Sequence, residues 1–182
     1  MIYGKLSLER RMKIIYLLTT GGTIEKVYSE QTGSVQNLDN KIDRYLSRLR
    51  LPDSEVRVLP LMNKDSLEMT YDDRAVILKT VRDLLADNAP IVITHGTDTM
   101  VETGLYLQRA LVELKVPIIL TRAMTPLGFE GSDGLQNLTE SLFAARLLHP
   151  GIYVVIHNQV FPIDRVRKDH KLTRFVWMEK VS

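Results

Sequence analysis

The sequence predicts an α/β fold, a three-layer sandwich in which a mainly parallel sheet lies between helices. Short apolar runs alternate along the chain with longer segments whose apolar residues recur at helical spacing. Polar clusters rich in threonine, glycine and aspartate follow the apolar runs. Alternation of this kind is typical of parallel sheets, because each parallel strand is reached through a crossover connection that is usually a helix.

Two strands and two helices are predicted in the first half of the chain. The apolar run 13–18 is a strand, and a polar loop separates it from a helix over 39–49. A short apolar run at 56–59 is the second strand, and a loop leads from it to a helix over 70–85. The apolar faces of these helices are formed by Ile42, Tyr45, Leu46 and Leu49, and by Ile77, Val81 and Leu85.

The second half continues the alternation. Strands are predicted at 91–94, 117–120 and 153–156, with helices over 99–114 and 137–148 between them. Two helices open on residues that fit a capping box, and a last strand is expected near the end of the chain. The capping pairs are Thr70 with Asp73 and Thr99 with Glu102, and the last strand is 174–178.

Composition limits the function classes. With 182 residues, of which 45% are hydrophobic, the sequence predicts one globular domain over 12–182, preceded by an extension over 1–11. The net charge of +2 suggests no nucleic-acid partner and no membrane surface, and no stretch has the length of a membrane span or a signal peptide. We therefore expect a cytoplasmic protein. The absence of cysteine excludes disulfides and thiolate chemistry, and the four histidines lack metal-site spacing, so no metal or cofactor is expected.

The stretch LLTTGGTI ends the first predicted strand on a run of threonines and glycines. Gly21 and Gly22 accept backbone angles that other residues resist, so this loop can approach a small ligand closely. Thr23 is then a candidate nucleophile. An ordinary strand-to-loop turn explains the same residues, and the stretch by itself does not separate the two interpretations.

A second cluster, THGTDT, follows the strand at 91–94. The capping box explains Thr99, but it does not explain Thr97 and Asp98, which precede the helix where free N–H groups favour negative charge. A threonine hydroxyl needs a base, and a lysine serves as one only in a setting that lowers its pKa. Lys168 has two arginines as near neighbours, Arg165 and Arg167, and fits this role; a solvated charge on a basic loop is the alternative.

All the unusual polar clusters follow predicted strands. Carboxyl ends of parallel strands meet at one edge of the sheet, where small ligands bind in folds of this class. Neither glycine cluster matches the dinucleotide or phosphate-binding fingerprints, and the nucleophile elbow of many hydrolases is absent. The sequence therefore predicts a small-molecule site without a nucleotide.

Five motifs together give the chain a resemblance to a known family. TTGGTIEK, DSLEM, ITHGTDTMVET, TRAMTPLGFEGSDGLQNL and DRVRK resemble, in this order, the amino-terminal domain of bacterial-type L-asparaginases over about 12–175. The resemblance implies hydrolysis of a side-chain amide through a threonine acyl-enzyme. It assigns Thr23 as nucleophile and Thr97, Lys168 and Asp98 as a triad. It also assigns substrate binding to Ser66, Asp98, Gly22 and Gly96, with Ser66 on the α-carboxylate and Asp98 on the α-ammonium.

Three departures from the family pattern accompany the resemblance. Tyr28 is the only nearby candidate for the family's flap tyrosine, and Leu67 stands where the family often has a polar residue. The resemblance covers only the first of the family's two domains, and we expect the second to be absent. We therefore expect a homodimer or higher assembly, with contacts through the helix 99–114 and the segment 161–174. The substrate is expected to be L-asparagine or a related small amide, with weak asparaginase activity, negligible glutaminase activity and affinity for L-aspartate.

Two other functions fit the same motifs. The first is a catalytically weak or inactive domain that keeps the pocket and binds an amino acid. The second is amide chemistry on a larger substrate, as in the related subunit of the transfer-RNA amidotransferase. The balanced charge of the chain argues against the second.

Overall fold

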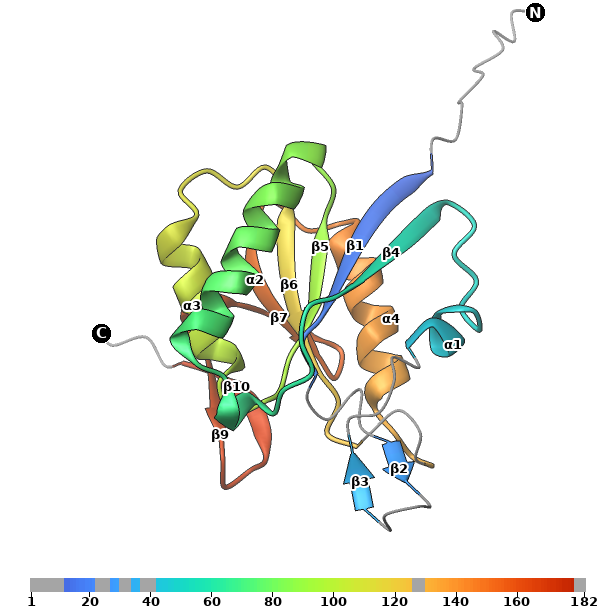
Figure 1. Ribbon diagram of the computed structural model, residues 1–182, viewed down its shortest axis with the longest axis vertical. Helices are drawn as coiled ribbons and strands as arrows, with labels where there is room; N and C mark the ends of the chain where they lie inside the picture. The colour runs from blue at the N-terminus through green and yellow to red at the C-terminus, as the bar shows by residue number, and fades with distance from the viewer. Residues whose placement is uncertain (1–11, 22–26, 30–33, 37–41, 126–129, 179–182) are drawn as a thin grey trace, which may run out of the picture.

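A six-stranded sheet organises the molecule (Figure 1). The computed structural model describes residues 12–21, 27–29, 34–36, 42–125 and 130–178. The strand order is β4-β1-β5-β6-β7-β8; the first five strands are parallel, and β8 pairs antiparallel with β7 at one edge. The strands are β1 (Lys13–Thr19), β4 (Ser54–Pro60), β5 (Ile91–Thr94), β6 (Pro117–Thr121), β7 (Gly151–Ile156) and β8 (Gln159–Pro162).

Helices cover both faces of the sheet, which confirms the predicted three-layer α/β fold. The helices α2 (Tyr71–Leu84) and α3 (Met100–Ala110) pack on one face, and α1 (Ile42–Leu46) and α4 (Gly134–Ala145) pack on the other. The smaller elements are β2 (Val27–Ser29) paired with β3 (Ser34–Gln36), β9 (Val166–Asp169) paired with β10 (Arg174–Trp177), and the 3-10 turns η2 (Ser66–Glu68), η3 (Leu85–Asp87) and η4 (Ile163–Arg165).

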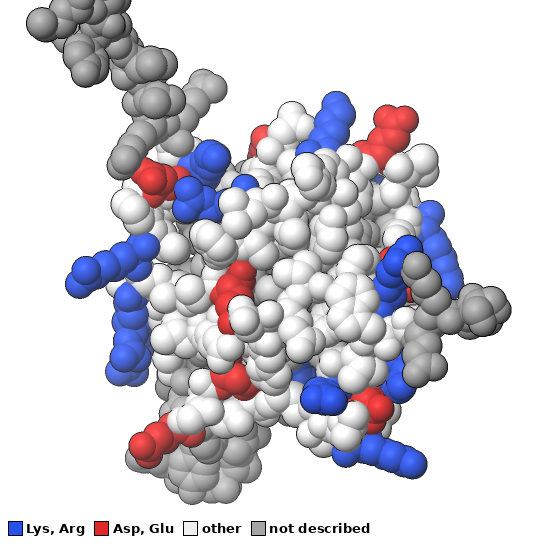
Figure 2. Space-filling view, turned by 180° about the vertical axis from the view of Figure 1, so that it is seen from behind, with Lys and Arg blue, Asp and Glu red and all other residues white. Residues whose placement is uncertain are grey.

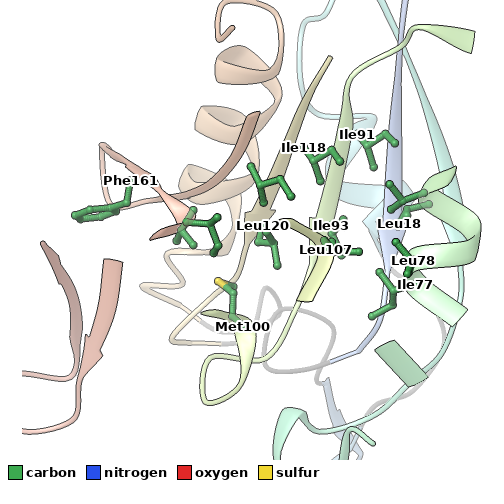
Figure 3. Close-up of a cluster of buried hydrophobic side chains, with 14 of the residues drawn as sticks. Leu18, Ile77, Leu78, Ile91, Ile93, Met100, Leu107, Ile118, Leu120 and Phe161 are labelled. Carbon is green, nitrogen blue, oxygen red and sulfur yellow. The ribbon is translucent and has the colours of Figure 1, made fainter. Parts of the chain in front are cut away.

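The central strands are apolar on both sides because both sides are covered. In β5 and β6 every residue is buried, and alternate side chains enter opposite layers. Figure 3 shows the layer between the sheet and the helices α2 and α3, where Ile93 and Leu120 from the strands meet Ile77 and Leu107 from the helices. The opposite layer contains Val92, Ile119, Leu138 and Leu142.

The connection from β6 to β7 has the opposite hand to the others. The steps β4 to β5 and β5 to β6 run in one direction across the sheet, with α2 and α3 on the same face. The step β6 to β7 runs in that direction too, yet α4 lies on the other face. Since about 98% of such crossovers are right-handed, this reversal is unusual.

Several element boundaries differ from the predictions: the helix predicted over 39–49 is observed at Ile42–Leu46, and that over 137–148 at Gly134–Ala145. The helix predicted over 99–114 ends at Ala110, because residues 111–116 must turn back to enter β6. Residues 174–178 were expected to form a last strand of the sheet; β10 instead pairs antiparallel with β9, and the two form a hairpin outside the main sheet.

The capping box predicted for α3 is wrong, whereas that of α2 is confirmed. Thr70 and Asp73 bond reciprocally at the start of α2. At α3 the Thr99 side chain makes no capping bond. Its hydroxyl donates to the Ser66 carbonyl over 2.8 Å instead, and Glu102 pairs with Arg74 at 3.0 Å. Both side chains therefore interact with residues distant in sequence and not with the backbone at the start of α3.

Charged side chains are dispersed on the face drawn in Figure 2. Lysine and arginine side chains lie mainly around its periphery, with acidic side chains among them, and the middle is largely uncharged. Among the described residues, no helix is long and apolar enough to cross a membrane.

Candidate active site

The site lies where the order of the strands reverses. From β1 the chain crosses to β4 on one side, and later elements build outward from β5 on the other. Ligands in open α/β sheets bind outside the carboxyl ends at such a switch point. The ends of β1 and β5 are tied together there, because the Thr20 hydroxyl donates to the Thr94 carbonyl over 2.8 Å. The threonine clusters predicted from the sequence therefore meet at one edge.

Gly21 is required by its surroundings. Its φ is +92°, and a Cβ there would lie 2.5 Å from the backbone nitrogen of Lys64. The Lys64 ammonium in turn holds Asp73 at the start of α2, with Nζ 2.7 Å from Oδ1. This contact is the main reason that the pKa of Asp73 is lowered to about 2. The loop after β4 is thus fixed against both β1 and α2.

Thr97, Asp98 and Lys168 are brought together from distant parts of the sequence. The Lys168 ammonium donates to Thr97 Oγ1 over 2.7 Å and also donates to the Asp98 carboxylate. The Lys168 side chain is 15% exposed and that of Asp98 is 32% exposed, so the pair is partly shielded from water. The hydrogen bond from Lys168 is the main cause that lowers the pKa of Asp98. A hydroxyl, an amine and a carboxylate therefore form one contact chain.

Ser66 lies on the other side of Asp98. It is 1% exposed, and its hydroxyl oxygen accepts a hydrogen bond from the Asp98 N–H over 3.2 Å. Gly96 permits this approach, since a Cβ at residue 96 would lie 2.6 Å from the Ser66 side chain. The serine hydroxyl keeps its own proton for a further acceptor, which suits contact with a carboxylate.

A buried histidine supports the loop that carries Thr97 and Asp98. The Nδ1 of His95 faces the Gly96 carbonyl at 2.7 Å, so Nδ1 carries the proton and Nε2 accepts from the Thr103 hydroxyl at 2.9 Å. The Nε of Arg74 donates to the same hydroxyl at 3.2 Å. Burial lowers the pKa of His95 to about 4, and the charge of Arg74 adds to the shift. The histidine is therefore neutral at ordinary pH.

Lys168 reaches the site on the hairpin of β9 and β10. In Figure 1 this hairpin lies beside α3 at the carboxyl end of the sheet. The turn η4 precedes it, and Ile163 of that turn packs into the surface of α3 at Gly104, where a Cβ would lie 2.3 Å from the isoleucine Cδ1. Phe175 pairs with Lys168 across the hairpin and is 5% exposed. Packing of η4 and β10 thus sets the position of the lysine.

The structure brings five of the residues predicted for the site into contact with one another. They are Ser66, Gly96, Thr97, Asp98 and Lys168. Thr23 and Gly22 lie outside the described residues. Tyr28 belongs to β2, and its side chain is likewise outside the description. No group of metal-ligating side chains occurs in the part of the chain that the structure describes. Leu67, beside Ser66, is 75% exposed.

Sequence reasoning missed two residues near the site. His95 was noted only for its spacing to other histidines, although its place between a buried strand and the GTD cluster was a signal. Arg122 directly follows β6 and is 2% exposed. The signal for Arg122 was a charged residue at the end of an apolar strand, within a cluster that the sequence had already placed at this edge.

Comparisons with known proteins show that the sequence and the fold of this chain are similar to those of one family. The family model described as "Asparaginase, N-terminal" matches residues 14–175. The L-asparaginase of Thermococcus kodakarensis is 31% identical over 161 residues, which are 88% of this chain and 49% of that protein. L-asparaginase 1 of Escherichia coli K12 is 34% identical over 166 residues, 87% of this chain and 48% of that protein. The chain thus spans about half the length of these relatives.

A solved structure agrees with the sequence matches. The thermostable L-asparaginase from Thermococcus kodakarensis superposes with a TM-score of 0.83 at 30% identity, covering 91% of this chain and 51% of that one. The sheet order and the helical layers described above are therefore shared with half of that protein.

Proposed function

The chain belongs to the asparaginase N-terminal domain family, and from this membership we propose that it hydrolyses the side-chain amide of L-asparagine or a related small amide. The products are the acid and ammonia. The observation that carries the proposal is the contact of the Lys168 ammonium with both the Thr97 hydroxyl and the Asp98 carboxylate. A hydroxyl next to an amine that a carboxylate orients is the arrangement of an activated nucleophile or an activated water.

The reaction proceeds in two steps in this proposal. Thr23 attacks the amide carbon, its proton passes to the leaving nitrogen, and ammonia departs from an acyl-enzyme. Water then attacks the ester and releases the acid. Thr97 and Lys168 take and return the protons, and backbone N–H groups of the loop around Thr97 stabilise the oxyanion.

Asp98 has two duties that are linked by charge. In the structure the Asp98 carboxylate accepts a hydrogen bond from the Lys168 ammonium. A lysine accepts a proton only when neutral. When the substrate's α-ammonium binds the Asp98 carboxylate, it competes with Lys168 for the same negative charge. In this proposal Ser66, whose hydroxyl accepts from the Asp98 N–H, donates its own proton to the α-carboxylate.

The test is ammonia release from L-asparagine and L-glutamine by the purified protein. Thr97→Val and Lys168→Met should each lower turnover by on the order of 10²–10⁴, the range of acid–base contributions, without loss of folding. Lys171→Met is the matched control, because Lys171 is an exposed lysine of the same hairpin and its removal changes the charge equally. Turnover close to that of the unmodified protein in either site variant would contradict the assigned role.

Binding measurements separate the enzyme from the alternative of an amino-acid-binding domain. L-aspartate should bind, and Asp98→Asn should bind it at least about tenfold more weakly, because the ammonium loses a charged partner. Ammonia release from L-asparagine supports the enzyme, and equal binding without release supports the binding domain. Equal affinity of Asp98→Asn and the unmodified protein would show that the carboxylate does not hold the ammonium.

A further inference from the structure

Arg122 is a buried cation beside the candidate active site that the mechanism above does not use. It follows β6 and is 2% exposed. Its Nε is buried and has no hydrogen-bond partner. Its carbonyl, by contrast, accepts from Asn137 over 2.9 Å. The backbone is thus held, while the Nε of the guanidinium is left without an acceptor.

Neighbouring groups attract the guanidinium, but its Nε donates a hydrogen bond to none of them. The Phe175 ring lies beneath it, with its centroid 5.7 Å from Cζ. The carboxylates of Asp133 and Asp98 attract it through space, while burial lowers its pKa to about 10. The side chain therefore stays charged at neutral pH. Buried polar groups in proteins are nearly always hydrogen-bonded, so a buried guanidinium N–H without an acceptor needs a functional explanation.

Two contacts place Arg122 in the wall of the site. The His95 N–H donates to the carbonyl of Thr121 over 2.9 Å, so the residue that follows Thr121 lies next to the loop of Thr97 and Asp98. On the other side, Phe175 is the cross-strand partner of Lys168. Arg122 is thus enclosed between the loop that carries the threonine and the hairpin that carries the lysine.

We propose that Arg122 is a carboxylate-recognition residue of this site, binding a carboxylate of the amino-acid ligand through paired N–H donors of its guanidinium. The planar guanidinium matches the two oxygens of a carboxylate, which a single hydroxyl such as that of Ser66 cannot do. The amino-acid class of the ligand rests on the proposed function. The carboxylate itself has two possible sources, which are the α-carboxylate and the side-chain carboxylate of the acid product.

The experiment measures ligand affinity by calorimetry and by the shift of the unfolding temperature. Arg122→Gln removes the charge and the fork, and Arg122→Lys keeps the charge alone. Arg146→Gln is the matched control. Arg146 is an exposed arginine that directly follows α4, and its loss changes the net charge equally. The ligands are L-aspartate, L-asparagine and succinate, compared at constant ionic strength.

Arg122→Gln should bind L-aspartate at least about tenfold more weakly than the unmodified protein, with Arg122→Lys intermediate and Arg146→Gln unchanged. Equal losses for L-aspartate and L-asparagine identify the α-carboxylate, and a loss for L-aspartate and succinate alone identifies the side-chain carboxylate. Without ligand, Arg122→Gln should be at least as stable as the unmodified protein, because it removes a buried charge whose Nε donates to no acceptor. A purely structural arginine predicts the opposite.

Unchanged affinity of Arg122→Gln and Arg122→Lys for all three ligands would overturn the inference, as would a failure of the unmodified protein to bind any of them. The two proposals fail separately. Normal asparagine turnover with unchanged KM in Arg122→Gln refutes the role of Arg122 and leaves the amidase standing. Arginine-dependent binding of carboxylates by a protein that releases no ammonia refutes the amidase and leaves the role of Arg122 standing.

Discussion

Each side chain of the candidate site depends on a partner from another element. Lys168 of β9 contacts Thr97 after β5, and Ser66 from the loop after β4 contacts the backbone of Asp98. Gly96 and Gly21 allow close contacts between these loops, because a Cβ at residue 96 would overlap Ser66 and a Cβ at residue 21 would overlap the backbone of Lys64. Substitutions at the site therefore act through geometry as well as through the loss of a functional group.

His95 predicts how stability depends on pH. Its pKa is lowered to about 4 in the folded state, from an ordinary value of 6.5. Between these two values the unfolded chain binds more protons than the folded protein, so the free energy of unfolding falls as the pH is lowered from about 6.5 to 4. A shift of this size corresponds to about 3 kcal/mol at most.

Denaturant unfolding of the unmodified protein and of His95→Gln, measured across that pH range, checks this expectation. The variant should be less stable at neutral pH and should lose less stability on acidification, because glutamine does not titrate. Parallel pH profiles for the two proteins would show that His95 does not provide the acid-sensitive step.

At the scale of elements, the contact between α3 and η4 fixes the hairpin that carries Lys168. Gly104 is the point of contact, and Ile163 fills the space above it while remaining 1% exposed. Glycine in a helix costs up to about 1 kcal/mol relative to alanine, so its presence here reflects packing and not helix propensity.

Gly104→Ala should destabilise the protein by about 1–3 kcal/mol, because the new methyl group overlaps a buried side chain that has no free space. It should also lower any amidase activity by displacing η4 and, with it, Lys168. The paired variant Gly104→Ala/Ile163→Ala removes the overlap. A double-mutant cycle of unfolding free energies should therefore show strong coupling, and additive effects of the two changes would contradict the packing argument.

At the scale of the whole molecule, assembly remains a prediction. We expect a homodimer or higher assembly, for which the helix α3 and the segment 161–174 were the contacts expected from the sequence. The structure adds a second apolar face, where Phe143 and Leu147 of α4 are 63% and 64% exposed beside the edge strand β8. Exposed apolar clusters of this kind are typical of interfaces.

Sedimentation at micromolar concentration measures the assembly directly. Phe143→Glu tests the face on α4, and Val112→Glu is the comparison, because Val112 is an apolar residue that is 93% exposed at the end of α3. We expect dissociation in Phe143→Glu if α4 forms the contact and in Val112→Glu if the end of α3 does. A stable monomer in the unmodified protein would refute the assembly prediction.

The sequence by itself determined the class of fold and most of the candidate residues. Apolar strands buried on both faces and helices with one apolar stripe are local patterns, so β1, β5 and α2 were predicted near their observed positions. Thr97, Asp98 and Ser66 were found because their motifs follow strands, and the carboxyl ends of parallel strands share one edge. Local chemistry was sufficient for these conclusions.

Only the tertiary structure decided the rest. The hand of the crossover through α4, the hairpin of β9 and β10, and the loss of the capping box at Thr99 all depend on partners distant in sequence. The same is true of Arg122, whose Nε is buried without a hydrogen-bond acceptor. Periodicity in a sequence reports which face of an element is apolar. It does not report which distant groups compete for a given donor or charge, and that competition is settled only when the chain is packed.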